Sequence, residues 1–265
     1  MDLNKFTGLV RRCVEDYSMI SDGDVIAAGV SGGKDSLALL VSLHNLRRYY
    51  PKRFSLRAVT LDMGIAGMDF LRVKELCDSL DIPYTIKKTE LAKVIFEERR
   101  EKNPCALCAK MRRGALNDII TELGVRKLAL AHHYDDAVET FLLSLFYEGR
   151  ISCFQPVTYM SRTGVTMIRP MLYIGEGSVR SLAARYDLPV VENLCPMNGN
   201  SKREEVKALV RTLSASYPDL KSKIFGAMQR LPLPSWGTDG NPRRPLPECV
   251  LTDCAKSRPS PRGGR

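Results

Sequence analysis

The chain has 265 residues, of which 44% are hydrophobic, and a formal net charge of +10. That apolar content is sufficient for a sizeable core, while the lack of an apolar run of roughly 18 residues and of a secretory pattern argues against membrane insertion and export. We therefore expect a cytoplasmic protein whose charge favours polyanionic partners, although charge alone equally serves solubility.

The first 23 residues predict an amphipathic helical lead, because Phe6, Val10 and Val14 recur at helical spacing. Strands and helices then alternate along the chain. The predicted strands are Asp24–Val30, Phe54–Leu61, Tyr84–Lys87 and Lys127–Ala131, and the predicted helices are Leu37–Tyr50, Met68–Leu80, a segment from Glu90 to just before Pro104, Cys108–Leu123 and Asp135–Tyr147. This alternation predicts an α/β fold with a doubly wound, mostly parallel sheet and helices on both faces.

The C-terminal part predicts a hairpin or extended return, two helices and a tail. Val157–Tyr173 is rich in β-branched residues around a Thr163–Gly164 turn, and Glu176–Tyr186 and Lys202–Ser216 follow a helical pattern. From residue 237 the composition shifts to Pro, Gly, Ser and Arg, which predicts disorder. The resulting division is a helical lead over 1–23, a main domain over 24–236 and a basic tail over 237–265.

A glycine-rich loop, Ser31-Gly32-Gly33-Lys34-Asp35-Ser36, follows the first predicted strand and opens a helix. Gly32 and Gly33 allow the backbone to approach an anion closely, and the helix start offers free N–H groups and a positive dipole end. The spacing differs from the Walker pattern. The loop therefore predicts an anion site, against the simpler alternative of a plain strand-to-helix turn.

This hexapeptide resembles the signature of the PP-loop ATP pyrophosphatases, enzymes that cleave ATP between its α- and β-phosphates and adenylate a carbonyl-type oxygen. The resemblance implies an adenine nucleotide alpha hydrolase-like fold. It also implies that the pyrophosphate end of ATP is held by Ser31, Gly32, Gly33, Asp35 and Ser36, with Lys34 as a weaker contact.

Two further segments resemble that family. Leu61–Gly64 ends the second predicted strand and is similar to the adenosine-side loop, which makes Asp62 a nucleotide-site residue. Ala131–Thr140 resembles the GHxxDDxxET segment of tRNA-modifying relatives and carries His132, with Ala131 in place of Gly. Its acids, Asp135 and Asp136, are candidates to bind the Mg²⁺ that accompanies ATP, or to transfer a proton. Alone, they would fit equally well as acids complementing a helix dipole.

Three cysteines lie in positions that suggest a ligand set. Cys105 and Cys108 form a CxxC element at a predicted helix start, where the dipole lowers the pKa of a thiol, and Cys195 precedes a proline. A CxxC element alone is compatible with zinc, a redox dithiol or a cluster. Three ligands with an open fourth position favour a catalytic cluster over a structural zinc site, which needs four ligands.

The remaining five of the eight cysteines predict structural or surface roles. Cys13 and Cys77 lie in apolar helical patterns and are expected in the core, as is Cys153 beside Ile151 and Phe154. Cys249 and Cys254 fall in the tail and are expected to be surface thiols. No secretory signal accompanies them, so a disulfide framework is not expected.

Together, SGGKDS, CALCAKMRRG, AHHYDDAVET and NLCP resemble the tRNA 2-thiocytidine synthetase family over about residues 1–230. The resemblance implies a 4Fe–4S cluster on Cys105, Cys108 and Cys195, use of ATP and Mg²⁺, and tRNA as substrate. ATP would adenylate the C2 oxygen of a pyrimidine, most simply cytidine 32, and a cluster-held sulfide would then expel AMP. A cysteine desulfurase or another sulfur donor and a homodimer are implied as well.

Basic residues near these motifs admit two interpretations. Arg112 and Arg113 follow Cys108 by one helical turn and are predicted to face ATP or RNA, although paired arginines usually form a solvated helix face. Lys202, Arg203 and Lys207 are either RNA contacts or exposed residues of a helix that Ser201 caps.

Three other functions remain open at this point. A 2-thiouridine synthetase typically carries additional CxxC zinc ribbons near its termini, which this chain lacks. A lysidine synthetase shares the loop and the acid pair but does not require the three cysteines. A non-catalytic RNA-binding or iron-sensing protein would not require an intact loop and acid pair.

Overall fold

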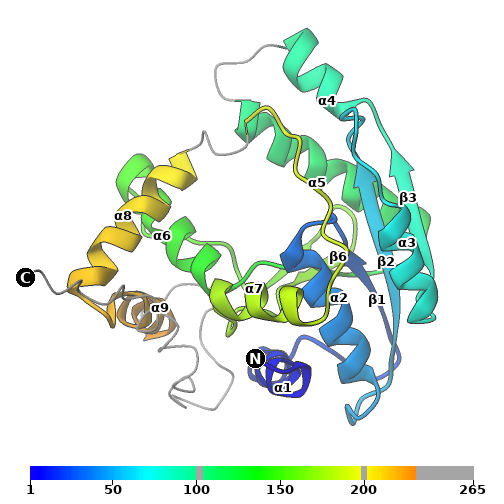
Figure 1. The fold of residues 1–265 in the computed structure, drawn as a ribbon, viewed down its shortest axis with the longest axis horizontal. Helices are drawn as coiled ribbons and strands as arrows, with labels where there is room; N and C mark the ends of the chain where they lie inside the picture. The colour runs from blue at the N-terminus through cyan, green and yellow to red at the C-terminus, as the bar shows by residue number, and fades with distance from the viewer. Residues whose placement is uncertain (100–103, 198–201, 231–265) are drawn as a thin grey trace, which may run out of the picture.

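The computed structural model describes residues 1–99, 104–197 and 202–230 (Figure 1). Ser201 and the tail over 237–265, with Cys249 and Cys254, lie outside these residues, so the predictions made for them stay untested. Within the described ranges, no helix has the length and apolar character that a membrane span requires.

The described residues form one six-stranded sheet in the order β3-β2-β1-β4-β6-β5. Its first five strands in this order pair in parallel, and β5 pairs with β6 antiparallel at one edge. The strands are β1 Asp24–Gly29, β2 Phe54–Asp62, β3 Tyr84–Lys88, β4 Lys127–Ala129, β5 Val157–Met160 and β6 Val165–Ile168. The predicted mostly parallel α/β sheet and the hairpin after residue 157 are both confirmed.

Helices cover both faces of the sheet (Figure 1). They are α1 Leu3–Asp16, α2 Lys34–Arg47, α3 Leu71–Ser79, α4 Leu91–Lys93, the π-helix η1 Val94–Arg99, α5 Pro104–Glu122, α6 Tyr134–Glu148, α7 Glu176–Arg185, α8 Lys202–Ser216 and α9 Leu220–Arg230.

The alternation of side chains along β1 builds two cores. Ile26 and Ala28 belong to the larger buried cluster, which includes residues of α1 and α2, whereas Ala27 joins a smaller cluster with Ile119 and Ile120 of α5. Successive strand side chains point to opposite faces, so a strand that is apolar throughout can bury both of its sides. This double burial keeps β1 at the centre of the sheet and fixes the position of the loop that follows it.

Some local expectations need correction. The helix predicted from Glu90 is a short α-helical turn that continues as a π-helix, a form often found at functional sites. Ile151 is 60% exposed and Cys153 is half-buried, so this segment only borders the core. Cys13 and Cys77 are buried, as predicted.

Helix α9 was not anticipated, yet it completes the core. Phe225 is fully buried, and its ring lies 4.8 Å from that of Tyr134 in α6 and 6.3 Å from that of Tyr173. The helix also ties back to α1, since Gln229 donates a hydrogen bond to the hydroxyl of Tyr17 at 3.3 Å. The last described helix therefore belongs to the folded domain.

We expect Phe225→Ala to lower the free energy of unfolding by about 3 to 5 kcal/mol, because it removes a large ring from a core that cannot fully collapse. Urea denaturation followed by circular dichroism measures this change. Tyr217→Ala, at a ring that is 60% exposed, should change stability by no more than about 0.5 kcal/mol. Equal effects of the two substitutions would contradict the packing of α9 on the core.

Candidate functional site

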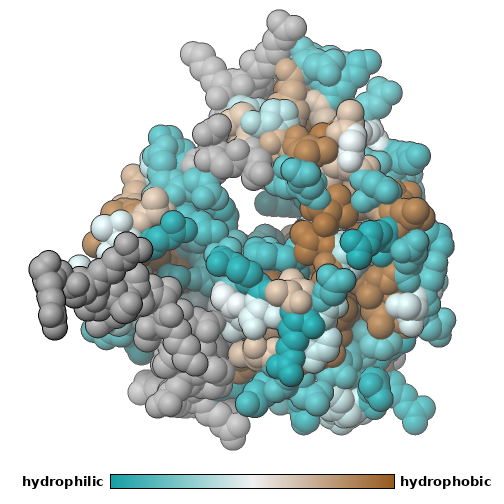
Figure 2. Space-filling model, in the orientation of Figure 1, coloured by the Kyte–Doolittle hydropathy of each residue, from teal (hydrophilic) through white to brown (hydrophobic). Residues whose placement is uncertain are grey.

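The candidate site lies at the carboxyl ends of the parallel strands. Along the sheet, β1 has β2 on one side and β4 on the other, which makes the junction of β1 and β4 the switch point where doubly wound sheets bind ligands. Figure 2 shows a hollow in this face, with hydrophilic residues along one part of its border and hydrophobic residues along another. In Figure 1 the N-terminal ends of α2 and α5 and the helix α8 surround the same region.

The glycine-rich loop is held in shape by its own serines. Ser36 Oγ accepts a hydrogen bond from the Ser31 amide at 3.1 Å and donates to the Gly33 carbonyl at 2.8 Å. Gly33 caps α2 without any side-chain hydrogen bond, and the first-turn amides of a helix have no carbonyl of that helix to bind. The Ser31 and Gly33 amides are thus bonded to serine hydroxyls within the loop, whereas the first-turn amides of α2 are available to an anion. Binding of an anion by Ser31–Ser36 stays a prediction.

Gly32 lies against a distant segment of the chain. Its φ is +82°, and a Cβ there would come within 2.8 Å of Val191. The Val191 amide donates to the Gly32 carbonyl at 2.9 Å. Only glycine combines this backbone conformation with such a close approach, so the requirement for glycine at this position has a structural cause beyond anion binding.

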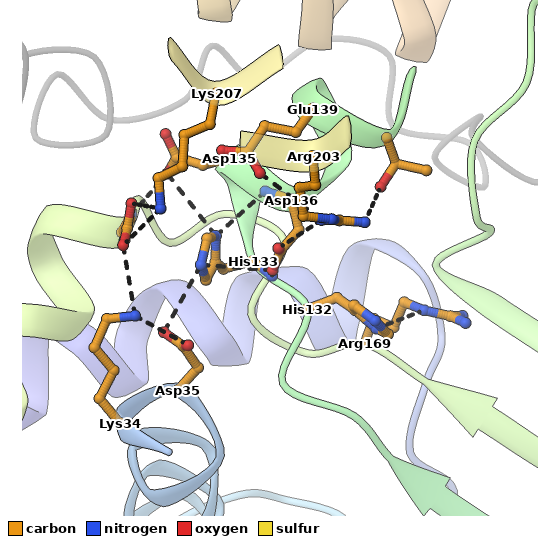
Figure 3. Close-up of polar contacts among 12 residues, drawn as sticks. Lys34, Asp35, His132, His133, Asp135, Asp136, Glu139, Arg169, Arg203 and Lys207 are labelled. Atoms are coloured by element: carbon orange, nitrogen blue, oxygen red, sulfur yellow. Dashed lines mark hydrogen bonds and ion pairs between the residues drawn. The ribbon is translucent and has the colours of Figure 1, made fainter. Parts of the chain in front are cut away.

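Partly buried carboxylates gather beside the loop (Figure 3). Asp35 Oδ1 is buried without a hydrogen bond and faces His133 Nε2 at 3.7 Å. Asp136 accepts from the His133 amide at 2.9 Å, completing a capping box of α6. Asp135 accepts from the Glu176 amide at 2.7 Å. Asp136 thus does cap its helix, the simpler role considered for it, but both acids also lie at the switch point.

Cations from α2, α8 and α9 pair with these acids. Lys221 lies 2.5 Å from Asp135 and Arg203 lies 3.1 Å from Asp136. Glu176 takes two partners, Lys207 at 3.1 Å and Lys34 at 3.5 Å. Three of the four cations come from the two C-terminal helices, which are thereby tied to the site.

Lys202, by contrast, lies on the surface over the ring of Tyr147, and Tyr147 donates a hydrogen bond to Glu205. Lys202 is therefore an exposed surface residue, one of the two interpretations considered for it, and is not part of the candidate site. Arg203 and Lys207, expected either at RNA or in solvent, instead bind the site's carboxylates.

The surroundings of these acids lower the pKa values of some of them and raise the pKa of another. Burial is the largest single effect on Glu176 and opposes its ionisation, but the hydrogen bond and charge of Lys207 together with the charges of Lys34 and His133 outweigh it and lower the pKa to about 2. For Asp136, burial is likewise outweighed by His133, His132 and Arg203, so its pKa is lowered. Burial and then the charge of Asp136 raise the pKa of Glu139 to about 7. Glu139 is therefore a group able to exchange a proton near neutral pH.

The three candidate cluster cysteines converge from two segments. Cys105 and Cys108 lie in the first turns of α5, and the segment that follows α7, to which Cys195 belongs, runs toward that end of α5 (Figure 1). Burial raises the pKa of Cys108; Arg112 opposes the rise, and the neighbouring thiols Cys195 and Cys105 add to it. The predicted lowering of thiol pKa at the helix start is therefore wrong for Cys108.

The charges of Cys105 and Cys195 both act on Cys108, so the three thiols lie in the same region of the fold. In the described part of the chain, however, no set of three or more His, Cys, Asp or Glu side chains is close enough to hold a metal ion. Arg112 hydrogen-bonds to Cys108 and therefore lies at the cysteines.

Asp62 shapes the loop after β2. Its Oδ1 accepts from the Gly64 amide at 2.9 Å, and its carbonyl accepts from Thr89 Oγ1 at 2.8 Å. A Cβ at Gly64 would lie 2.6 Å from the Thr89 carbonyl. The role of Asp62 toward a nucleotide stays a prediction.

Sequence reasoning did not select Glu176, Lys221 or Arg169 as site residues. Glu176 begins a predicted helix and offered the signal of an acid in a first turn. Arg169 directly follows a strand end, which is where ligand-binding residues of parallel sheets lie. Lys221 belongs to α9, which no pattern indicated.

Comparison with known proteins finds a matching family model, similar sequences and a similar solved structure. A family model described as PP-loop domain matches residues 6–211. The tRNA-cytidine(32) 2-sulfurtransferase of Syntrophotalea carbinolica is 38% identical over 85% of this chain and 87% of the relative. That of Pelobacter propionicus is 37% identical over 84% of each chain. The solved U34-tRNA thiolase NcsA from Methanococcus maripaludis, with its [4Fe-4S] cluster, has a TM-score of 0.68 and 26% identity over 83% of this chain and 75% of that chain.

We expect Gly32→Ala to destabilise the protein by at least about 1 kcal/mol, because the residue has positive φ and its Cβ would overlap Val191. Gly33→Ala is the matched control. Its φ is −72° and its Cβ would meet only Ser31 Oγ, at 3.5 Å, so stability should stay within about 0.5 kcal/mol. Urea denaturation compares the two. A Gly32→Ala variant as stable as the Gly33→Ala variant would show that Val191 does not pack against the loop.

Proposed function

Because the chain belongs to the PP-loop domain family, and to the same family as the tRNA-cytidine(32) 2-sulfurtransferases, we propose that it uses ATP to replace the 2-oxygen of cytidine 32 in tRNA by sulfur. One observation carries the proposal. The segment after α7 contacts the phosphate loop through Val191, and it carries Cys195, whose charge acts on Cys108. Activation of an oxygen by ATP and delivery of sulfur are the two operations that such a reaction requires, and this segment joins their two sites.

The nucleotide half of the site is suited to phosphate oxygens and a hard cation. The loop amides at the start of α2 face an anion, and the buried Oδ1 of Asp35 lacks a hydrogen-bond partner in the described structure. Magnesium prefers oxygen ligands. Asp35, Asp135 and Asp136 are the carboxylates that would hold it.

The first chemical step follows from these groups. The 2-oxygen of the pyrimidine bonds to the α-phosphorus as the bond to the β-phosphate oxygen breaks, and pyrophosphate leaves with that electron pair. The loop amides and Lys34 stabilise charge on the phosphates. Lys207 and Lys221 pair with carboxylates here and would supply further positive charge to the phosphate oxygens. Sulfide addition at C2 then expels AMP with its electron pair.

The cysteines have the donor chemistry of an iron–sulfur site, because thiolates are the usual ligands of such clusters. Cys105, Cys108 and Cys195 would hold a 4Fe–4S cluster, leaving one iron without a protein ligand. When bound, the cluster would supply the site from which sulfide is transferred. Arg112 is suited to stabilise the thiolate form of Cys108, since its charge acts to lower that pKa.

The partners follow from the reaction. A net charge of +10 favours tRNA, since each neutralised phosphate releases counterions. Replacing oxygen by sulfur also requires a sulfur donor, for which a cysteine desulfurase has the right chemistry. A homodimer, implied by the family, is part of the same proposal.

Mass spectrometry of tRNA nucleosides from cells with and without the gene tests the function. Loss of 2-thiocytidine in the deletion strain, restored by the intact gene, is expected. Loss of 2-thiouridine instead would redirect the proposal to the activity named for the M. maripaludis thiolase. An unchanged thionucleoside profile would refute tRNA thiolation.

We expect Asp135→Asn and Asp136→Asn each to lose most thiolation while retaining bound iron, because the acids serve the nucleotide half of the site. Asparagine preserves the size and the capping ability of the side chain. Asp118→Asn, at an exposed acid of α5, is the control and should keep full activity. Iron analysis and thiolation of purified tRNA measure both properties. Full activity of both site variants would leave these acids with a capping role alone.

We also expect anaerobically purified protein to hold about four irons per chain, as a cubane cluster requires. Cys105→Ser, Cys108→Ser and Cys195→Ser should each lose most of this iron. Cys77→Ala, at a buried core thiol, should retain it. Stoichiometric zinc without iron would overturn the cluster assignment.

A further inference from the structure

Arg169 is a buried cation at the carboxyl end of β6, with an exposed fraction of 5%. In the described part of the chain its side chain contacts uncharged groups. Nη1 donates to the Gln155 carbonyl and to Thr158 Oγ1, and the guanidinium lies 5.0 Å from the ring centroid of Phe154. Burying a charge without a carboxylate partner is costly, and none of these contacts explains why the strand should end in arginine.

The remaining contact of Arg169 is with His132, the residue before His133 of the candidate site. Its Nε donates a hydrogen bond to His132 Nδ1 at 3.2 Å (Figure 3). Arginine has donors only, so Nδ1 must carry a lone pair. A neutral imidazole has one such nitrogen, which places the ring proton on Nε2. Phe154 packs on the same ring, with centroids 4.7 Å apart, and restricts its orientation.

The surroundings also keep His132 uncharged. Burial, followed by the charge of Arg169, lowers the pKa of His132 to about 4. Among the described residues, the bond from Arg169 is the single hydrogen bond of this side chain, so its Nε2–H is left for a group outside the chain. The adjacent His133 differs, because its ring nitrogens face Asp35, Asp135 and Asp136.

We propose that Arg169 is a positioning residue that holds His132 as a neutral Nε2–H donor, aimed at an anionic oxygen of the bound substrates. The inference rests on the proposed function for the identity of that oxygen, which belongs either to a phosphate of the nucleotide or to the adenylated base. A fixed donor stabilises negative charge without reorganising during the reaction. Arg169 itself does not touch the substrate.

The tautomer is measured without ATP or tRNA. The chain has three histidines, so long-range ¹H–¹⁵N spectra of the labelled full chain, compared with His132→Gln, identify the signals of His132. Nε2 should carry the proton, and Nδ1 should show the shift of a hydrogen-bonded acceptor rather than that of a free one. The second criterion matters because neutral histidine in water also favours Nε2–H. A protonated Nδ1, or an Nδ1 without a hydrogen bond, overturns the proposal whatever the variants do.

Activity supplies the second readout. Arg169→Met should lower kcat for thiolation roughly tenfold or more, as losses of supporting contacts commonly do, with KM for ATP changed far less, and should move the Nδ1 signal. Arg169→Lys, which keeps a buried donor, should recover part of kcat. Thr158→Val removes another contact of Arg169 but leaves Nε in place, so it should preserve the Nδ1 signal and most activity.

A folded Arg169→Met variant with unchanged kcat and Nδ1 signal would assign Arg169 a purely structural role. If Arg169→Met does not fold, the wild-type spectrum and Thr158→Val still decide the hydrogen bond. If wild-type protein does not thiolate tRNA while its His132 spectrum is as expected, the proposed function fails and the positioning of His132 stands.

Discussion

Charge balance at the carboxyl edge of the sheet is the constraint on which the rest of the site depends. Acids from α2, α6 and α7 lie partly or fully buried beside the phosphate loop, and burying a charge is costly unless it is paired. Lys207 of α8 and Lys221 of α9 supply that pairing for Glu176 and Asp135. The C-terminal helices are therefore held against the parallel domain by the same groups that would bind magnesium and phosphate.

This arrangement gives the cations two roles at different stages. In the structure they neutralise the acids. In the proposed reaction, a magnesium ion on the carboxylates would release the same lysines to pair with phosphate oxygens. The pKa values of two acids differ accordingly. Glu176 is kept ionised, with Lys207 as its main cationic partner, whereas the pKa of Glu139 is raised to about 7, which suits it to exchange a proton.

A single segment joins the nucleotide half to the cysteine half. Val191 packs on Gly32 of the phosphate loop, Leu194 lies 3.0 Å from the position a Cβ would take on Gly67, and Cys195 follows at once. The same short segment therefore contacts the phosphate loop and carries the third candidate thiol, whereas Cys105 and Cys108 lie on a separate helix, α5.

The sequence by itself determined the parts whose signals are local. The SGGKDS loop, the acid pair and the CxxC element could be placed at strand and helix ends, because glycine conformation, capping and hydrophobic period depend on a few neighbouring residues. The tertiary structure decided which of these parts meet. The bond from Arg169 to His132 spans 37 positions and that from Lys221 to Asp135 spans 86. The raised pKa of Cys108 likewise comes chiefly from burial. Such contacts follow from strand order and helix packing, which no local pattern encodes.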